Sequence, residues 1–197
     1  MADANAIILG FAKIWTAPYG TAFPAATIAY GASWGGSWTY FGDTLEPLTL
    51  GGDRAQFEVE IQQALSPVKT IITKDSKSFS TVMAEHNILV FNELLLGTAV
   101  NTAPGSGTPG YYTLDYGGKS TPNVLAVGFE SLWQNAAGVQ TPIRWMFYRG
   151  QIIMDGELTY DKNGVAGIPI RINTLTDSTQ TTNKQMGRLQ IVYSAGT

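Results

Sequence analysis

Residues 57–73 read Phe-Glu-Val-Glu-Ile-Gln-Gln-Ala-Leu-Ser-Pro-Val-Lys-Thr-Ile-Ile-Thr, and this stretch is the clearest sign of a β fold. Its first six residues alternate apolar and polar side chains, which is the pattern of a strand with one wet face. The run from Val68 to Thr73 is rich in β-branched residues and is expected to fold back as a hairpin. In the expected register Val59 faces Ile72 and Ile61 faces Thr70. Residues 78–82 are expected to continue the same sheet.

The rest of the chain also has the composition of strands and turns. Twenty-two glycines and nine prolines separate short runs rich in Val, Ile, Thr, Tyr and Trp. Residues 161–164 (Asp-Lys-Asn-Gly) are expected to close a hairpin, because Asn and Gly tolerate positive φ. The expected strands are residues 111–116, 125–132, 143–148, 151–160, 168–174 and 189–193.

One segment, residues 87–96, has the pattern of a helix. Ile88, Phe91 and Leu95 recur at the i, i+3, i+7 spacing of one helical face, and Gly97 follows as a stop signal. We expect these three side chains to pack the helix on the sheet. Because no linker or repeat divides residues 1–197, the sequence predicts one domain. Its fold class is mainly β, a β-sandwich or partly rolled barrel with one flanking α-helix.

Residues 98–122 are expected to form a long insertion loop rich in Pro, Gly, Ser and Thr. Within them, residues 105–110 match the dinucleotide-binding pattern G-x-G-x-x-G letter for letter. That pattern binds a pyrophosphate only between a strand and a helix. Here two prolines interrupt it and a strand pattern follows, so we interpret the match as plain loop.

Charged residues are scarce, at 14% of the chain, where soluble domains usually have about 25%. Charge is costly to bury at protein–protein contacts, so a weakly charged surface favours a subunit that is covered by copies of itself. A net charge of −3 argues against a protein that wraps nucleic acid, which needs a basic stripe. No apolar run approaches the length of a membrane span, so no membrane partner is expected.

Few residues could carry catalysis or hold a metal. The chain has no cysteine and one histidine, and we interpret His86 as a capping or packing residue. The acidic pairs Glu58/Glu60 and Asp155/Glu157 stand at i, i+2 and would share a strand face. That spacing could suit a glycosidase pair or a calcium site, although a solvated strand face is the simpler interpretation. We therefore expect no enzyme activity, catalytic residue, metal or cofactor.

Three parts of the chain share the layout of a known family. The first contains Ala-Pro-Tyr-Gly-Thr-Ala at residues 17–22 and Trp-Thr-Tyr-Phe-Gly-Asp-Thr at residues 38–44; the middle runs from the alternating strand into the helix. The last part contains Gly-Glu-Leu-Thr-Tyr at residues 156–160, Ile-Pro-Ile at 168–170 and Leu-Thr-Asp at 175–177. In this order the chain resembles the major tail tube proteins of long, non-contractile-tailed bacteriophages.

The resemblance implies a structural virion protein, made in the host bacterial cytoplasm. Six copies would form a ring, and stacked rings would form the tail tube that conducts DNA without binding it specifically. The other expected partners are a tape-measure protein inside the tube, a tail terminator, and distal tail or baseplate proteins. The alternatives are another ring, tube or capsid-decoration subunit of a virion, a secretion-needle subunit, and a sugar-binding β-sandwich that uses the five tryptophans and nine tyrosines.

The resemblance also directs attention to residues 45–67 as a loop or hairpin that reaches the next ring. We expect the contact in the loop 45–54, or at the tip formed by residues 64–67. Residues 37–66 hold five acidic residues against one arginine, and DNA slides more easily past a neutral or acidic wall. Glu58 and Glu60 are therefore candidates for the wall of the bore or for an inter-ring contact. The candidate inter-ring residues are Leu50, Gly51, Gly52, Asp53 and Arg54.

Overall fold

The computed structural model describes residues 8–59, 66, 68–134, 139–158, 160 and 166–192. The expected mainly β fold with a helix is confirmed. The chain runs through β1 (Ile8–Pro18), β2 (Thr39–Asp43), β3 (Thr49–Val59), β4 (Lys69–Met83), α1 (Ile88–Leu94), β5 (Thr98–Thr102), β6 (Tyr111–Asp115), β7 (Leu125–Gln134), β8 (Gln140–Met154), β9 (Ile168–Thr174) and β10 (Gly187–Ile191).

Eight of these strands form one antiparallel sheet in the order β2-β1-β7-β8-β9-β4-β3, with β10 also paired to β8. The long strand β8 organises the sheet. Its residues 140–150 pair with β7, residues 143–147 pair with β10, and residues 150–154 pair with β9. The strands β10 and β9 therefore lie one after the other along the same edge of β8.

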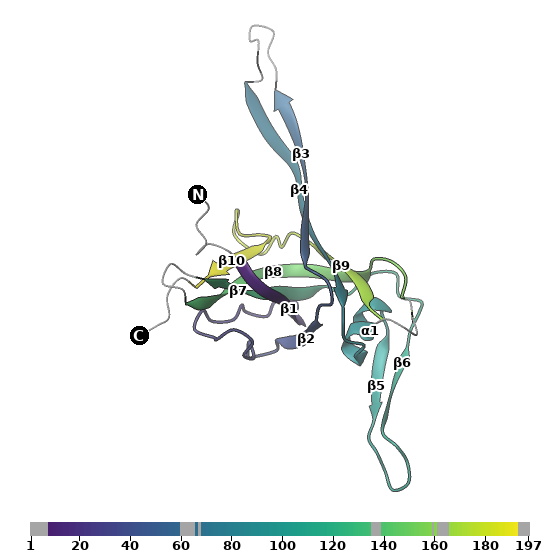
Figure 1. Ribbon diagram of the computed structural model, residues 1–197. Helices are drawn as coiled ribbons and strands as arrows, with labels where there is room; N and C mark the ends of the chain where they lie inside the picture. Colours follow the sequence, from purple (N-terminus) through teal and green to yellow (C-terminus); the bar gives the residue numbers. More distant parts are fainter. Residues whose placement is uncertain are drawn as a thin grey trace.

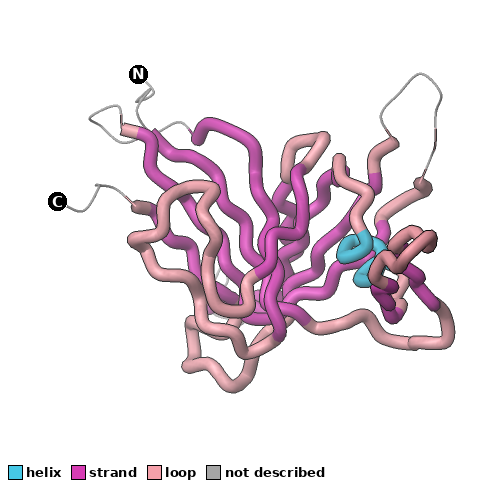
Figure 2. The backbone as a smooth tube through the Cα atoms, turned by 90° about the horizontal axis from the view of Figure 1, so that it is seen from below, coloured by secondary structure: helices cyan, strands magenta, loops and turns pink. Residues whose placement is uncertain are grey.

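The sheet curls until its two sides meet. The rings of Phe79 in β4 and Phe129 in β7 lie 4.5 Å apart, although three strand spacings, about 14 Å in a flat sheet, separate those strands in the sheet order. At one end β2 also meets β4: Leu45 donates its N–H to the Val82 carbonyl at 2.7 Å, and Ala84 donates to the Asp43 carbonyl at 2.9 Å. The partly rolled barrel is thus observed, and Figure 2 shows the curved strands from below.

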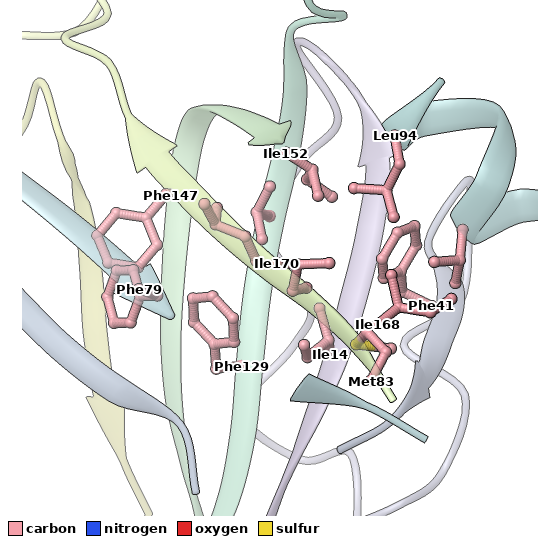
Figure 3. Packing of buried hydrophobic residues seen from close by; sticks show 13 residues of the cluster. Ile14, Phe41, Phe79, Met83, Leu94, Phe129, Phe147, Ile152, Ile168 and Ile170 are labelled. Carbon is pink, nitrogen blue, oxygen red and sulfur yellow. The ribbon is translucent and has the colours of Figure 1, made fainter. Parts of the chain in front are cut away.

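The inside of the curled sheet holds the main core (Figure 3). The strands β1, β2, β4, β7, β8 and β9 contribute apolar side chains to it, and so does α1. Burial of these side chains removes apolar surface from water and so stabilises the fold. Its buried members are Ile14, Phe41, Phe79, Met83, Val90, Leu94, Val127, Phe129, Phe147, Ile152, Ile168, Ile170 and Ile172.

A second cluster lies on the outer face, under the loop of residues 19–38. Trp15 and Trp34 stack at 5.4 Å, and Trp34 meets Trp38 edge-on at 5.0 Å. All three indoles are buried, so these tryptophans do not form an exposed sugar-binding platform. They fasten the loop to the sheet.

The helix α1 begins one residue after its cap, Asn87, whose side-chain oxygen accepts the Val90 N–H at 2.9 Å. The buried side chains of α1 are Val90 and Leu94, four residues apart on one face. The three expected packing residues are only partly buried: Phe91 packs against the main core, and Ile88 and Leu95 lie beside it. The core-facing stripe is therefore rotated from the one predicted. The left-handed residue after the helix is Leu96, at φ 54°, one position before the expected stop at Gly97.

Among the remaining strands, residues 111–116, 125–132 and 168–174 were predicted nearly at their observed bounds. Residues 143–148 and 151–160 were predicted as two strands, but residues 143–148 and 151–154 belong to one strand, β8, and residues 155–158 lie outside any strand. The strand β1 was not predicted. The expected turn at residues 161–164 lies outside the described residues. No helix in the described part of the chain is long and apolar enough to cross a membrane.

Candidate assembly surfaces

The strands β3 and β4 form a long hairpin that leaves the body of the molecule (Figure 1). Only residues 78–83 of β4 pair with β9, so the described hairpin residues beyond Ser78 have no other strand beside them. We call this part, residues 51–59 and 68–77, the β3–β4 arm. Its β3 residues are exposed from Gly51 to Glu58.

The expected hairpin is confirmed, but its register is wrong. Val59 pairs with Lys69 and Phe57 pairs with Ile71, where Val59 was expected to face Ile72. The Val68 N–H also reaches the Val59 carbonyl at 2.9 Å, in keeping with the observed pairing of Val59 with Lys69. A shift of three residues changes which side chains share a face, because the side-chain period of a strand is two.

The observed register gives the arm two different faces, because cross-strand partners point to the same side. The register shifts by one residue between Ala55 and Gln56, where Thr73 of β4 is the extra residue of a bulge. The Glu58 face carries Gly52, Arg54, Gln56, Glu58, Thr70, Ile72, Asp75 and Lys77. The Phe57 face carries Gly51, Asp53, Ala55, Phe57, Val59, Lys69, Ile71, Lys74 and Ser76.

Ion pairs cross the arm on both faces. On the Glu58 face, Asp75 accepts hydrogen bonds from Lys77 at 2.9 Å and from Arg54 at 2.9 Å. These bonds hold the pKa of the Asp75 carboxyl below its ordinary value, and the bond from Lys77 has the larger effect, followed by the bond from Arg54. On the Phe57 face, Lys74 pairs with Asp53 at 2.5 Å. Because the pairs are exposed, they set the charge of the surface more than the stability of the fold.

The candidate inter-ring residues Leu50 to Arg54 lie in a strand, and the expected loop 45–54 is replaced from Thr49 onward by β3. A Cβ on Gly51 would lie 3.0 Å from the Ser78 hydroxyl oxygen, and one on Gly52 would lie 3.0 Å from the Lys77 ammonium nitrogen. The two glycines therefore let neighbouring side chains lie across the ribbon. Leu50 is 47% exposed beside Phe79.

Of the two candidate wall residues, Glu58 is exposed on the Glu58 face of the arm, and Glu60 lies outside the described residues. The acidic excess that residues 37–66 have along the chain is not found on the Glu58 face of the described arm. Arg54 and Lys77 balance Glu58 and Asp75 on the Glu58 face. The count over residues 37–66 did not include the lysines of β4, because the folded hairpin is what places them on the same surface.

The expected insertion loop, residues 98–122, also contains strands. β5 and β6 form a separate two-stranded sheet, which points away from the β3–β4 arm (Figure 1). We call this hairpin, residues 98–115, the β5–β6 arm. Its residues 105–110, which match the dinucleotide-binding pattern, lie in the turn region between the strands, as expected of plain loop. Its large exposed side chains are Val100, Tyr111 and Tyr112.

The candidate chemical sites do not come together. Strand β8 ends before Asp155, so Asp155 and Glu157 do not share a strand face, and Asp155 instead pairs with Arg171 at 2.7 Å. His86 stacks near Phe91 with ring centroids 6.0 Å apart, next to the capping residue Asn87. Within the described residues, no group of three or more His, Cys, Asp or Glu side chains could hold a metal ion.

Elsewhere, hydrogen bonds hold loops in place. Burial alone would raise the pKa of the Asp177 carboxyl, but the hydrogen bonds that it accepts from Thr179, Tyr19 and Gln180 lower it below the ordinary value. The Tyr40 phenol has a raised pKa because of burial and its hydrogen bond to Asp43. Asp177 thereby joins its loop to Tyr19, which follows β1, whereas the Tyr40–Asp43 bond lies within β2.

The curled sheet carries two arms whose exposed side chains offer surfaces for association with other chains. The family model described as phage tail tube protein matches residues 1–186. The chain belongs to this family, and it is accordingly a structural, non-enzymatic component of the virion tail. Among curated proteins, none matches the chain.

Proposed function

We propose that six copies of this chain form a ring and that stacked rings form the tube of a long, non-contractile phage tail. The observation that supports this most is the β3–β4 arm, whose β3 residues are exposed from Gly51 to Glu58. A two-stranded hairpin is marginally stable by itself in water. An arm of this length therefore needs cover, and other copies of the chain supply it in a tube.

The stacking of rings is a head-to-tail contact, which repeats without closing and so makes a filament. Leu50 to Arg54 lie at the base of the arm and contribute to the contact between rings in this proposal. The half-exposed helix residues Ile88 and Leu95 face a neighbouring subunit beside the sheet. Closing the ring also covers free strand edges, which would otherwise recruit other chains.

The Glu58 face of the arm is proposed to line the bore. Its two cationic and two anionic side chains balance, so the wall neither grips nor strongly repels the phosphates of passing DNA. Glu60 is proposed to extend this wall. The tape-measure protein would occupy the same bore before DNA does, and terminator and distal tail proteins would cap the two ends.

Electron microscopy of the purified protein over a range of concentrations tests the proposal. Open-ended tubes of constant width, built from six-fold rings, are expected. Single rings that never stack would indicate a completion or terminator ring instead. A protein that stays monomeric at every concentration, even with a tail-tip complex present, would overturn the proposed function.

A further inference from the structure

The two arms leave the body in opposite directions (Figure 1). Both are two-stranded, and each leaves large apolar or aromatic side chains exposed. Phe57 and Ile71 on the β3–β4 arm are 59% and 42% exposed, and Val100 and Tyr111 on the β5–β6 arm are 51% and 52% exposed. Both arms have the same need for cover.

The β5–β6 arm also has two unlike faces. One face carries Leu114, which packs so closely on the end of the helix that a Cβ on Gly97 would lie 2.5 Å from its Cδ1. The other is the Tyr111 face, which points away from that contact. From the register, the Tyr111 face consists of Thr98, Val100, Thr102, Tyr111, Thr113 and Asp115. Asp115 is its single charged residue.

We propose that the Tyr111 face of the β5–β6 arm packs on the Phe57 face of the β3–β4 arm from a copy in the next ring. This inference rests on the proposed function, since it names a contact that joins stacked rings. Arms that point in opposite directions approach each other when identical copies stack head to tail. Each then passes the other, so the base of one arm meets the outer end of its partner.

This arrangement brings matching chemistry together. Asp115 lies at the base of the β5–β6 arm, and Lys69 lies at the outer end of the described β3–β4 arm. Within the described residues, neither side chain has an ion-pair partner. Placing them together would neutralise both charges.

The next positions along the two arms match as well. Two residues from the proposed ion pair, Val100 and Thr113 lie farther out on the β5–β6 arm, and Phe57 and Ile71 lie nearer the base of the β3–β4 arm. The proposed packing brings these two pairs of residues together. Their contact would remove exposed apolar surface from water. The other two charges of the Phe57 face, Asp53 and Lys74, already pair with each other, so no like charges are forced together.

Charge reversal tests the contact. We expect Lys69→Asp and Asp115→Lys, each made alone in the full chain, to form rings but to lose tubes. The double variant, in which the charges are exchanged, should form tubes again. Lys184→Asp, a reversal at an exposed loop position, is the matched control and should form tubes like the wild type. Circular dichroism should show the same fold in all variants, since these side chains are exposed.

A cysteine pair gives a second measurement. The natural chain has no cysteine, so a disulfide between positions 69 and 115 in Lys69→Cys/Asp115→Cys tubes would join different copies. Wild-type tubes together with tubes from both single reversals would overturn this inference and leave the proposed function standing. Failure of the exchanged double variant to recover tubes would also overturn it. Absence of tubes from the wild type would instead remove the proposed function and this contact with it.

Discussion

The buried pair of Glu130 and Arg144 joins β7 to β8 and also binds the loop 19–38. Both side chains are fully buried, and the Arg144 Nη2 lies 2.7 Å from the Glu130 Oε1. The other carboxylate oxygen accepts the Gly31 N–H at 2.9 Å, and the guanidinium also donates to the Ala25 carbonyl. Because every charge here is matched, the pair ties two strands and the loop into one unit.

Glu130→Ala should therefore lower the free energy of unfolding by about 3–5 kcal/mol, because it leaves the Arg144 charge buried without a partner. Asp155→Ala breaks a partly exposed pair with Arg171 and should cost no more than about 1 kcal/mol. Urea unfolding of the two purified variants measures the difference. Equal losses would mean that the buried pair does not fasten the loop.

At the scale of elements, alternation along the chain is a clear guide to a strand where one of its faces is buried. In β9, Ile168, Ile170 and Ile172 point into the core between less buried residues, and its bounds were predicted. The strand β1 has no such alternation, because Ile14 enters the core while Trp15 lies under the outer loop. The β5–β6 arm lacks it for the opposite reason, since most of its side chains are exposed.

The helix also shows what a sequence pattern leaves open. The spacing of apolar residues predicts a helix, but it does not say which side of the helix packs on the core. Leu94→Ala should cost about 2–5 kcal/mol, as expected for emptying a closed core site. Ile88→Ala, from the stripe predicted by spacing, should cost much less because its partly exposed side chain leaves no closed cavity. Thermal unfolding of the two variants compares them directly. A larger loss for Ile88→Ala would show that the predicted stripe is the one that packs.

At the scale of the whole molecule, the features that matter for assembly depend on contacts between distant residues. The sheet closes where Leu45 meets Val82 and Ala84 meets Asp43, and no local pattern indicates this meeting. The charge of the β3–β4 arm is likewise a property of two strands, because Lys74 of β4 pairs with Asp53 of β3 and Arg54 of β3 pairs with Asp75 of β4. The fold class and the existence of an arm could be predicted from the sequence, whereas its register and balanced charge required the hairpin itself.

Because the arm packs so little on the body, folding and assembly should be separable. Replacing residues 54–75 by an Asn-Gly turn would join Asp53 to Ser76, which already face each other across the hairpin, through a loop type that suits antiparallel strands. The melting temperature should change by no more than about 4 °C, equivalent to about 1 kcal/mol in a chain of this size. The same variant should form no tubes under conditions in which the wild-type protein polymerises, as measured by sedimentation and electron microscopy. Normal tubes from the shortened chain would show that the arm is dispensable for stacking, and a large drop in melting temperature would show that it belongs to the folding unit.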